Sequence, residues 1–196
     1  MGTRAYRGRS PEERTTERRE RLLAAGLDLW GELGWSGVTV RGVCARAGLT
    51  DRYFYESYAD RDALLLAVFD QVRDGLAAVM LAVPWRGEPR QIMHAMLTAL
   101  LTALRDDPRK ATVAFTDPAG SPALESRRHD ALIDLADTLA VQVAAATAQQ
   151  TRVEALYCVG GVGALISTWL AGRLDSTAEA LADRCTELIA RSFAVP

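Results

Sequence analysis

Residues 39–65, TVRGVCARAGLTDRYFYESYADRDALL, constrain the fold of this chain more than any other stretch. Their apolar residues recur at spacings of three and four, which indicates helices and not strands. Gly48 and Leu49 interrupt the pattern and predict a tight turn between two short helices, with Thr39 and Thr50 as the N-caps. Two short helices around such a turn are typical of a helix-turn-helix DNA-binding motif.

Helix signals continue on both sides of this stretch, and no run of residues alternates as a half-buried strand would. Ser10 followed by a proline predicts the start of the first helix, which Gly34 ends, and Asp60 caps the fourth. The sequence therefore predicts an all-α fold of about nine helices in two domains, residues 1–59 and 60–196. The expected later helices cover residues 60–83, 90–105, 109–115, 123–148, 152–170 and 177–191.

The charge of the chain is distributed unevenly, although its net charge is only −2. Residues 1–21 contain seven Arg and four Glu, whereas residues 61–196 contain 13 basic and 16 acidic side chains. A basic end beside an acidic remainder suits a protein that touches phosphates with one end only. A solvated, arginine-rich tail would have the same charge, so composition alone leaves both readings open.

The sequence offers little sign of a membrane span, a disulfide framework, a metal or a cofactor. No apolar run approaches about 18 uninterrupted residues, and no apolar run follows the N-terminal arginines as it would in a secretory signal. The three cysteines are far apart, which predicts reduced, buried thiols in a cytoplasmic protein. The two histidines, His94 and His129, have no second ligand at metal-binding spacing.

The predicted turn contains the residue types that a helix-turn-helix requires. Cys44 supplies a small side chain where the two helices cross, and Gly48 tolerates a positive φ. In the second, recognition helix, Phe54 and Tyr58 are expected in the core. Its other side chains are expected to face DNA, where Arg can read guanine edges or grip phosphate and Tyr can contact phosphate or thymine methyls.

This N-terminal region resembles the TetR family of bacterial transcriptional regulators. The resemblance runs over residues 18–65 and includes a Leu-rich first helix ending in LWGELGWSGVTV, the Ala-Gly-Leu-Thr turn, and Tyr-x-x-aromatic followed by a charged cap and Leu-Leu. It implies a three-helix DNA-binding domain, a divergent helical ligand-binding domain, and a homodimer that usually represses genes until a small molecule binds.

The recognition-helix reading and the resemblance together predict contacts with a double-stranded DNA operator at Thr39, Arg41, Thr50, Asp51, Arg52, Tyr53 and Tyr55. The sequence departs from the family pattern at Ala59, where many members have a phosphate-gripping Lys, and at Glu56, where His is common. Asp51 and Glu56 are unfavourable near phosphates, but they could accept from cytosine amino groups or orient Arg52. An N-terminal arm could compensate by following the DNA backbone, or could be a free terminus; its residues are Arg4, Tyr6, Arg7 and Arg9.

The second domain is expected to hold the dimer interface and the effector site. Small residues on the eighth helix allow close helix approach, and in the family's layout the last two helices pair across a two-fold axis; the expected interface residues are Gly160, Gly161, Gly163, Ala164 and Leu165. A tight crossing within one chain is the alternative. Met and aromatic side chains make adaptable cavities for a partly apolar ligand; the candidates are Trp85, Met93, His94, Met96, Phe115, Gln142, Tyr157 and Trp169.

The sequence therefore predicts a ligand-responsive DNA-binding repressor that is not an enzyme. An activator, or a regulator with a protein effector, would have the same sequence features. A small all-helical enzyme is the alternative from another class. The sequence contains no Ser/Cys–His–acid set, no Glu-x-x-His pair and no glycine-rich phosphate loop, which argues against it.

Overall fold

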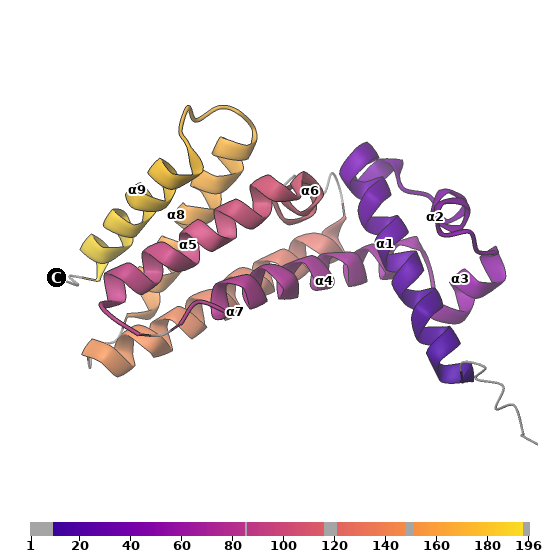
Figure 1. Cartoon of the computed structure of the whole chain (residues 1–196), viewed down its shortest axis with the longest axis horizontal. Coiled ribbons are helices and arrows are strands. Elements are labelled where there is room, and N and C mark those ends of the chain that lie inside the picture. Colours follow the sequence, from indigo (N-terminus) through magenta and orange to yellow (C-terminus); the bar gives the residue numbers. More distant parts are fainter. Residues whose placement is uncertain (1–9, 85, 116–120, 148–150, 194–196) are drawn as a thin grey trace, which may run out of the picture. The chain divides into compact units, whose positions relative to one another are not determined.

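The computed structural model of the chain describes residues 10–84, 86–115, 121–147 and 151–193. Within these ranges the chain forms nine α-helices and no strand, which confirms the predicted all-α fold (Figure 1). The helices are α1 Pro11–Gly37, α2 Val40–Ala47, α3 Asp51–Ser57, α4 Arg61–Leu81, α5 Pro89–Asp106, α6 Pro108–Phe115, α7 Pro122–Thr147, α8 Arg152–Leu170 and α9 Ala178–Ser192. The predicted arm residues Arg4, Tyr6, Arg7 and Arg9, and the ligand candidate Trp85, lie outside the described residues.

The chain divides into two compact units between Val68 and Phe69, so the division falls inside α4. The first two turns of α4 belong to the first unit because Leu64, Leu65 and Val68 are completely buried. A Cβ added to Gly26 of α1 would lie 3.0 Å from Cγ2 of Val68, so α1 and α4 approach closely there. The predicted boundary after residue 59 separates the two domains by function, and it stays a prediction.

The first helix begins where the sequence predicts and bends where the sequence predicts its end. Ser10 and Glu13 form a reciprocal capping box, with the Glu13 amide 3.0 Å from the Ser10 hydroxyl. Gly34 has a φ of 72° and breaks the helical geometry, yet one more turn follows to Gly37. This turn is held by Trp35, which is 6% exposed and packs edge-on against Trp30 at 5.0 Å between ring centroids.

The helix-turn-helix geometry of α2 and α3 follows from its caps. The Thr39 hydroxyl accepts from the Gly42 amide at 3.1 Å, and Gly48 ends α2 in the left-handed region with a φ of 62°. Arg21 of α1 donates to the carbonyl oxygens of Ala47 and Gly48, so its guanidinium satisfies acceptors at the end of α2.

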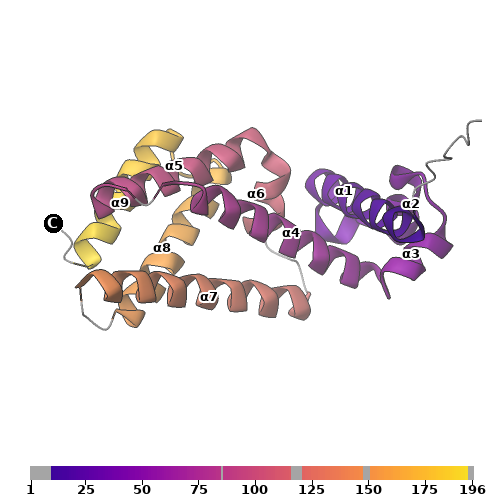
Figure 2. The ribbon, with the colours of Figure 1, turned by 60° about the horizontal axis from the view of Figure 1, so that its bottom comes forward.

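In the second unit α5 lies against α9 and α7 against α8 (Figure 2). Leu97, Leu101 and Leu104 of α5 share one helical face and are buried. The α7 helix is tied to α4 by Arg127, whose Nε donates to Asp70 at 2.9 Å. The predicted caps Ser121 and Thr177 hold the starts of α7 and α9 by accepting from the Leu124 and Ala180 amides.

We expect Gly48→Ala to lower the free energy of unfolding by about 1–2 kcal/mol, because a φ of 62° crowds any Cβ against the following carbonyl. The added Cβ would also lie 3.0 Å from Nη2 of Arg21, which is bonded to the end of α2. Urea unfolding followed by circular dichroism measures this loss. Gly75→Ala in α4 is the control: nothing lies within 4 Å of its added Cβ, so it should be neutral or stabilising. A Gly48→Ala protein as stable as the wild type would contradict this account.

Candidate DNA-binding surface and effector region

The recognition helix α3 has a buried side and an exposed side, and the four aromatic residues divide between them as predicted. Phe54 is 0% and Tyr58 5% exposed, and their ring centroids are 6.0 Å apart. Tyr53 and Tyr55 are 37% and 60% exposed. The core pair therefore fixes α3 in the first unit while the other two rings remain available to a partner.

The exposed side of α3 carries charges of both signs. The side chain of Arg52 is 84% exposed, and its Nε lies 3.0 Å from Oε1 of Glu56 one turn later. Such an exposed pair adds little stability, but it gives the guanidinium of Arg52 a defined direction. This arrangement agrees with the second of the two roles considered for Glu56, the orientation of Arg52.

Asp51, at the first position of α3, faces the buried thiol of Cys44 in α2. Burial raises the pKa of Cys44 to about 11, and the hydrogen bond to the Asp51 carboxylate adds to this shift. Cys44 is 3% exposed and so occupies the helix crossing as predicted. Asp51 thus lies near Cys44 at the α2–α3 junction, and its predicted contact with DNA stays a prediction.

The remaining predicted DNA contacts lie at the starts of the two helices. Thr39 and Arg41 are exposed at the start of α2, and the Thr39 hydroxyl is occupied by the Gly42 amide. Thr50 is exposed at the N-cap of α3, and its side chain makes no capping hydrogen bond. The Thr50 hydroxyl therefore keeps its hydrogen-bonding capacity for a partner.

Two arginines of α1 that sequence reasoning did not assign lie against α3. The guanidinium carbon of Arg18 lies 4.7 Å from the centroid of the Tyr53 ring, and that of Arg19 lies 4.4 Å from the Tyr58 ring. Arg19 also donates to the Ser57 carbonyl at 3.0 Å. The sequence signal was only the excess of arginine in residues 1–21, since pairing across α1 and α3 depends on the tertiary fold.

In the second unit, one face of α8 carries mostly small and apolar side chains and is exposed. Its exposed residues after the first are Val153, Tyr157, Gly161, Ala164 and Thr168, which recur with helical spacing. A Cβ added to Gly160, Gly161 or Gly163 would meet nothing within 4 Å. Within the described residues, these three glycines therefore do not mediate a tight crossing within one chain.

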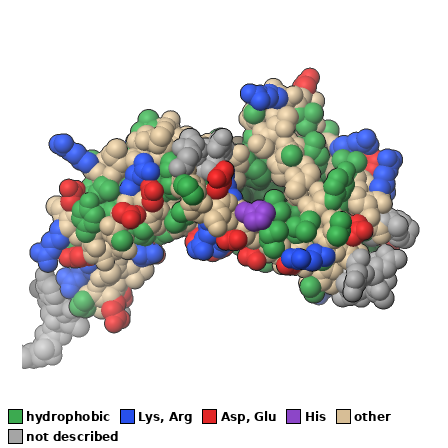
Figure 3. Space-filling model, turned by 180° about the vertical axis from the view of Figure 1, so that it is seen from behind, with side chains coloured by type: hydrophobic (Ala, Val, Ile, Leu, Met, Phe, Trp, Pro, Cys, Tyr) green, Lys and Arg blue, Asp and Glu red, His purple; other side chains and the backbone are tan. Residues whose placement is uncertain are grey.

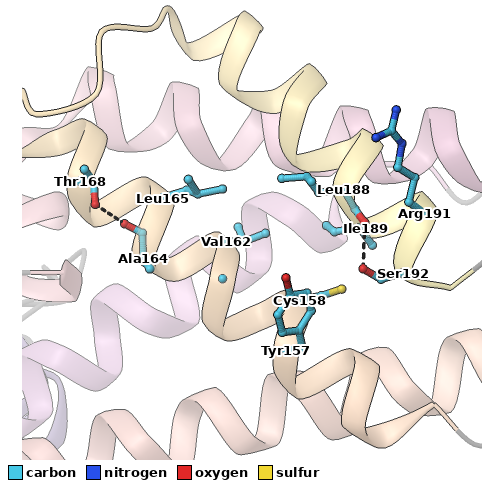
Figure 4. Close-up of a pocket in the computed structure, with 11 residues that line it drawn as sticks. Tyr157, Cys158, Val162, Ala164, Leu165, Thr168, Leu188, Ile189, Arg191 and Ser192 are labelled. Carbon is cyan, nitrogen blue, oxygen red and sulfur yellow. Dashed lines mark hydrogen bonds between the residues drawn. The ribbon is translucent and has the colours of Figure 1, made fainter.

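A groove of about 520 Å³ lies between this face of α8 and α9 (Figure 4). Leu165 from α8 and Leu188 from α9 point toward one another in it, and Tyr157, which is 74% exposed, lies at one end. Hydrophobic side chains also reach the surface between charged ones on the face drawn in Figure 3. Because Tyr157 also lines the groove, its exposed ring and the groove belong to one surface.

The ligand candidates within the described residues are distributed over four helices, α5, α6, α7 and α8. Met93, Met96 and Phe115 are half-buried, whereas Gln142 is exposed. Trp169 is engaged by the protein itself, since its Nε1 donates to the Ser176 carbonyl at 2.8 Å in the turn before α9. The structure brings no three of these candidates together in either of the two cavities described here, so their role in ligand binding stays a prediction.

The other cavity, of about 580 Å³, lies between α5 and α9 and contains one candidate, His94. The Nε2 of His94 lies 2.9 Å from Oδ1 of Asp183. Arg90, Arg184 and Glu187 also line this cavity, so charges of both signs balance within it.

Among the described residues, no group of three or more His, Cys, Asp or Glu side chains could hold a metal ion. All three cysteines are free and buried. One helix of the described chain, Arg152–Leu170, is long and apolar enough to cross a membrane by length and composition, which is weak evidence for a span.

Residues 22–68 match the family model for bacterial regulatory proteins of the tetR family. The search of curated proteins gave no match. Solved structures match over nearly the whole chain. A TetR-like transcriptional regulator from Rhodococcus sp. RHA1 has a TM-score of 0.72 at 18% identity and covers 91% of this chain and 97% of its own.

Two regulators named FadR, of which the first is described as a fatty acid degradation regulator, show the same fold. FadR from Bacillus halodurans has a TM-score of 0.73 at 14% identity, covering 93% of this chain and 96% of its own. FadR from Bacillus subtilis, solved in complex with stearoyl-CoA, has a TM-score of 0.71 at 14% identity, covering 87% and 96%. At these identities the likeness shows the fold, while the family match lies in the helix-turn-helix unit itself. The first unit of this chain therefore resembles the DNA-binding region of the tetR family of bacterial regulatory proteins, and the chain as a whole shares the fold of TetR-like transcriptional regulators.

Proposed function

We propose that this chain acts as a homodimeric repressor that binds a palindromic operator and leaves it when a small molecule binds. The observation that supports this most directly is the outward presentation of Arg52, Tyr53 and Tyr55 by a helix whose inner side is fixed by Phe54. In the proposed complex, one α3 from each protomer enters the major groove, and the two grooves are successive, about 34–36 Å apart.

The proposed contacts divide into two kinds. Arg52 donates to guanine or to phosphate, and Tyr55 contacts phosphate or a thymine methyl. Thr39, Arg41 and Thr50 contact phosphates around the starts of α2 and α3. The arm that contains Arg4, Arg7 and Arg9 is proposed to follow the DNA backbone, and Asp51 is proposed to act mainly through the α2–α3 linkage.

We expect Arg52→Ala and Tyr55→Ala each to weaken binding to a duplex selected from a random-sequence library by on the order of tenfold or more. Both side chains are exposed, so neither change removes core packing. Fluorescence anisotropy measures the affinity, and circular dichroism checks the fold. Arg105→Ala removes an exposed arginine from α5 in the second unit and should leave the affinity unchanged. Wild-type affinity in both α3 variants would refute the assignment of this surface.

The proposed dimer interface is the exposed face of α8 together with the groove beside α9. Glycines that meet nothing in their own chain leave room for a second helix, and the exposed Tyr157 adds an aromatic side chain to the same face. We propose that a two-fold axis brings this face against its own copy and covers the predicted residues Gly160, Gly161, Gly163, Ala164 and Leu165. On this proposal Tyr157 serves the interface, in place of the ligand role predicted for it.

We expect Gly161→Glu to raise the dimer dissociation constant by on the order of 100-fold, because the two-fold axis brings two carboxylates together in an apolar interface. Analytical ultracentrifugation over a concentration series measures this change. Gly75→Glu is the matched control, since Gly75 is also a helical glycine with nothing within 4 Å of its added Cβ. A Gly161→Glu protein that dimerises like the wild type would show that the interface lies elsewhere.

The proposed effector has a long apolar part. Only 17% of the apolar stretch within α8 is buried inside the chain. This helix therefore has apolar surface for a ligand as well as for a dimer partner. Met93, Met96 and Phe115, all half-buried, are retained as proposed contacts. The similarity of fold to a regulator solved with stearoyl-CoA supports an acyl chain as the first ligand class to examine.

We expect stearoyl-CoA to weaken binding to the selected duplex by about tenfold or more, because a ligand that prefers one state shifts the equilibrium toward it. It should also raise the melting temperature of the free protein by mass action. Anisotropy and thermal-shift measurements test both effects, with coenzyme A lacking the acyl chain as the control. If neither stearoyl-CoA nor stearic acid alters DNA binding or melting, the proposed ligand class is wrong.

The second candidate mode of regulation, activation, would use the same surfaces, and transcription of the adjacent gene with and without the protein distinguishes the two. We propose regulation without catalysis, since the family and fold are those of transcriptional regulators. We also propose a cytoplasmic location, with the apolar surface of α8 used for dimer and ligand contacts.

A further inference from the structure

The contact between Arg18 and Tyr53 connects α1 to the exposed side of the recognition helix. The guanidinium carbon of Arg18 lies 4.7 Å from the centroid of the Tyr53 ring, a distance typical of a cation–π interaction. The ring is 37% exposed, so Arg18 covers part of it and leaves the rest open. The guanidinium therefore lies beside the surface proposed to meet DNA.

Arg18 is held in place by a neutral hydroxyl, and no carboxylate among the described residues neutralises its charge. Its Nη2 donates to the Thr15 hydroxyl at 3.0 Å, one turn earlier in α1. Within the described residues no carboxylate lies at ion-pair distance from Arg18, whereas Arg52 is paired with Glu56 at 3.0 Å. A guanidinium has five N–H donors, so most of those on Arg18 remain for an anion.

The neighbouring arginine shows a different use. Arg19 donates to the Ser57 carbonyl at 3.0 Å and stacks on the buried Tyr58. These contacts bind α1 to the end of α3. Arg19 is therefore part of the framework, while Arg18 stacks on an exposed ring.

The charge of α3 explains why a cation from another helix is needed there. Asp51 and Glu56 are acidic, and Arg52 is the single basic side chain of α3. Phosphates that approach this helix thus meet more negative than positive charge on it. A planar guanidinium already oriented on a ring can donate two parallel hydrogen bonds to a phosphate with little further loss of side-chain freedom.

We infer that Arg18 grips a DNA phosphate beside the recognition helix, with Tyr53 as the platform that positions it. This inference rests on the proposed DNA-binding function. Tyr53 then orients the guanidinium of Arg18, and α1 contributes part of the affinity for the DNA phosphate backbone.

The test measures binding of the full-length protein to two duplexes of equal length, one selected from a random-sequence library and one scrambled, over a series of NaCl concentrations. Arg18→Gln should weaken binding to both duplexes by a similar factor, on the order of tenfold. It should also make the slope of the logarithm of the association constant against log [NaCl] shallower by about 0.9 for each DNA-binding unit of the dimer. The reason is that binding with one phosphate contact fewer releases fewer counterions.

Variants at Tyr53 test the platform. Tyr53→Phe keeps the ring and should keep the wild-type slope, whereas Tyr53→Leu removes it and should lower the slope as Arg18→Gln does. In the Tyr53→Leu background, Arg18→Gln should have a smaller effect than it has alone. Arg105→Gln, which removes one exposed positive charge from α5, should leave the slope unchanged.

The outcomes separate this inference from the proposed function. A wild type that binds the duplexes, with a salt slope that Arg18→Gln does not change, would overturn the Arg18 inference alone. Loss of affinity for the selected duplex only would also overturn it, because that result indicates base reading. A wild type that selects no duplex would overturn the proposed function itself. Circular dichroism of each variant verifies that a reduced salt dependence of binding does not come from unfolding.

Discussion

The close approach of α4 to α1 at Gly26 is the contact on which the rest of the molecule depends. A Cβ there would lie 3.0 Å from Cγ2 of Val68 and 3.4 Å from Cδ2 of Leu64, so the glycine lets these two α4 side chains pack directly against the backbone of α1. The contact includes the first two turns of α4 in the DNA-binding unit, while the same unbroken helix continues to Leu81 in the second unit. The two units are thus joined by one continuous helix, α4, and not by a linker.

The elements that depend on neighbouring residues could be predicted from the sequence. The caps at Ser10, Thr39 and Thr177 are local hydrogen bonds, and the positive φ of Gly48 follows from its place at a helix end. The division of the aromatic residues of α3 into a core pair and an exposed pair also follows from helical spacing. Gly34 shows the limit of local rules, because the packing of Trp35 on Trp30 continues the helix by one turn beyond it.

The parts of the site that depend on tertiary packing could not be predicted. Arg18 and Arg19 are adjacent in the sequence, yet one stacks on an exposed ring and the other on a buried one. Trp169 is of a residue type that often lines ligand sites, but its indole donates a hydrogen bond to the Ser176 carbonyl. A cavity forms where several helices leave space between them, and no single helix carries that information. This is why the sequence specifies the DNA-binding surface in more detail than the effector site.

The charges of the first unit suggest that affinity and selectivity reside on different helices. Because Arg52 is paired with Glu56, α3 attracts phosphates weakly, and its ion pair must open or share its donors before Arg52 can contact a base. Arg18 on α1 and Arg41 on α2 form no ion pair within the described residues, and they can supply the attraction that does not depend on sequence. A recognition helix with little net charge gains binding free energy mainly from contacts with the correct bases and little from phosphates. It therefore favours its correct site over random DNA by more than a strongly basic helix would.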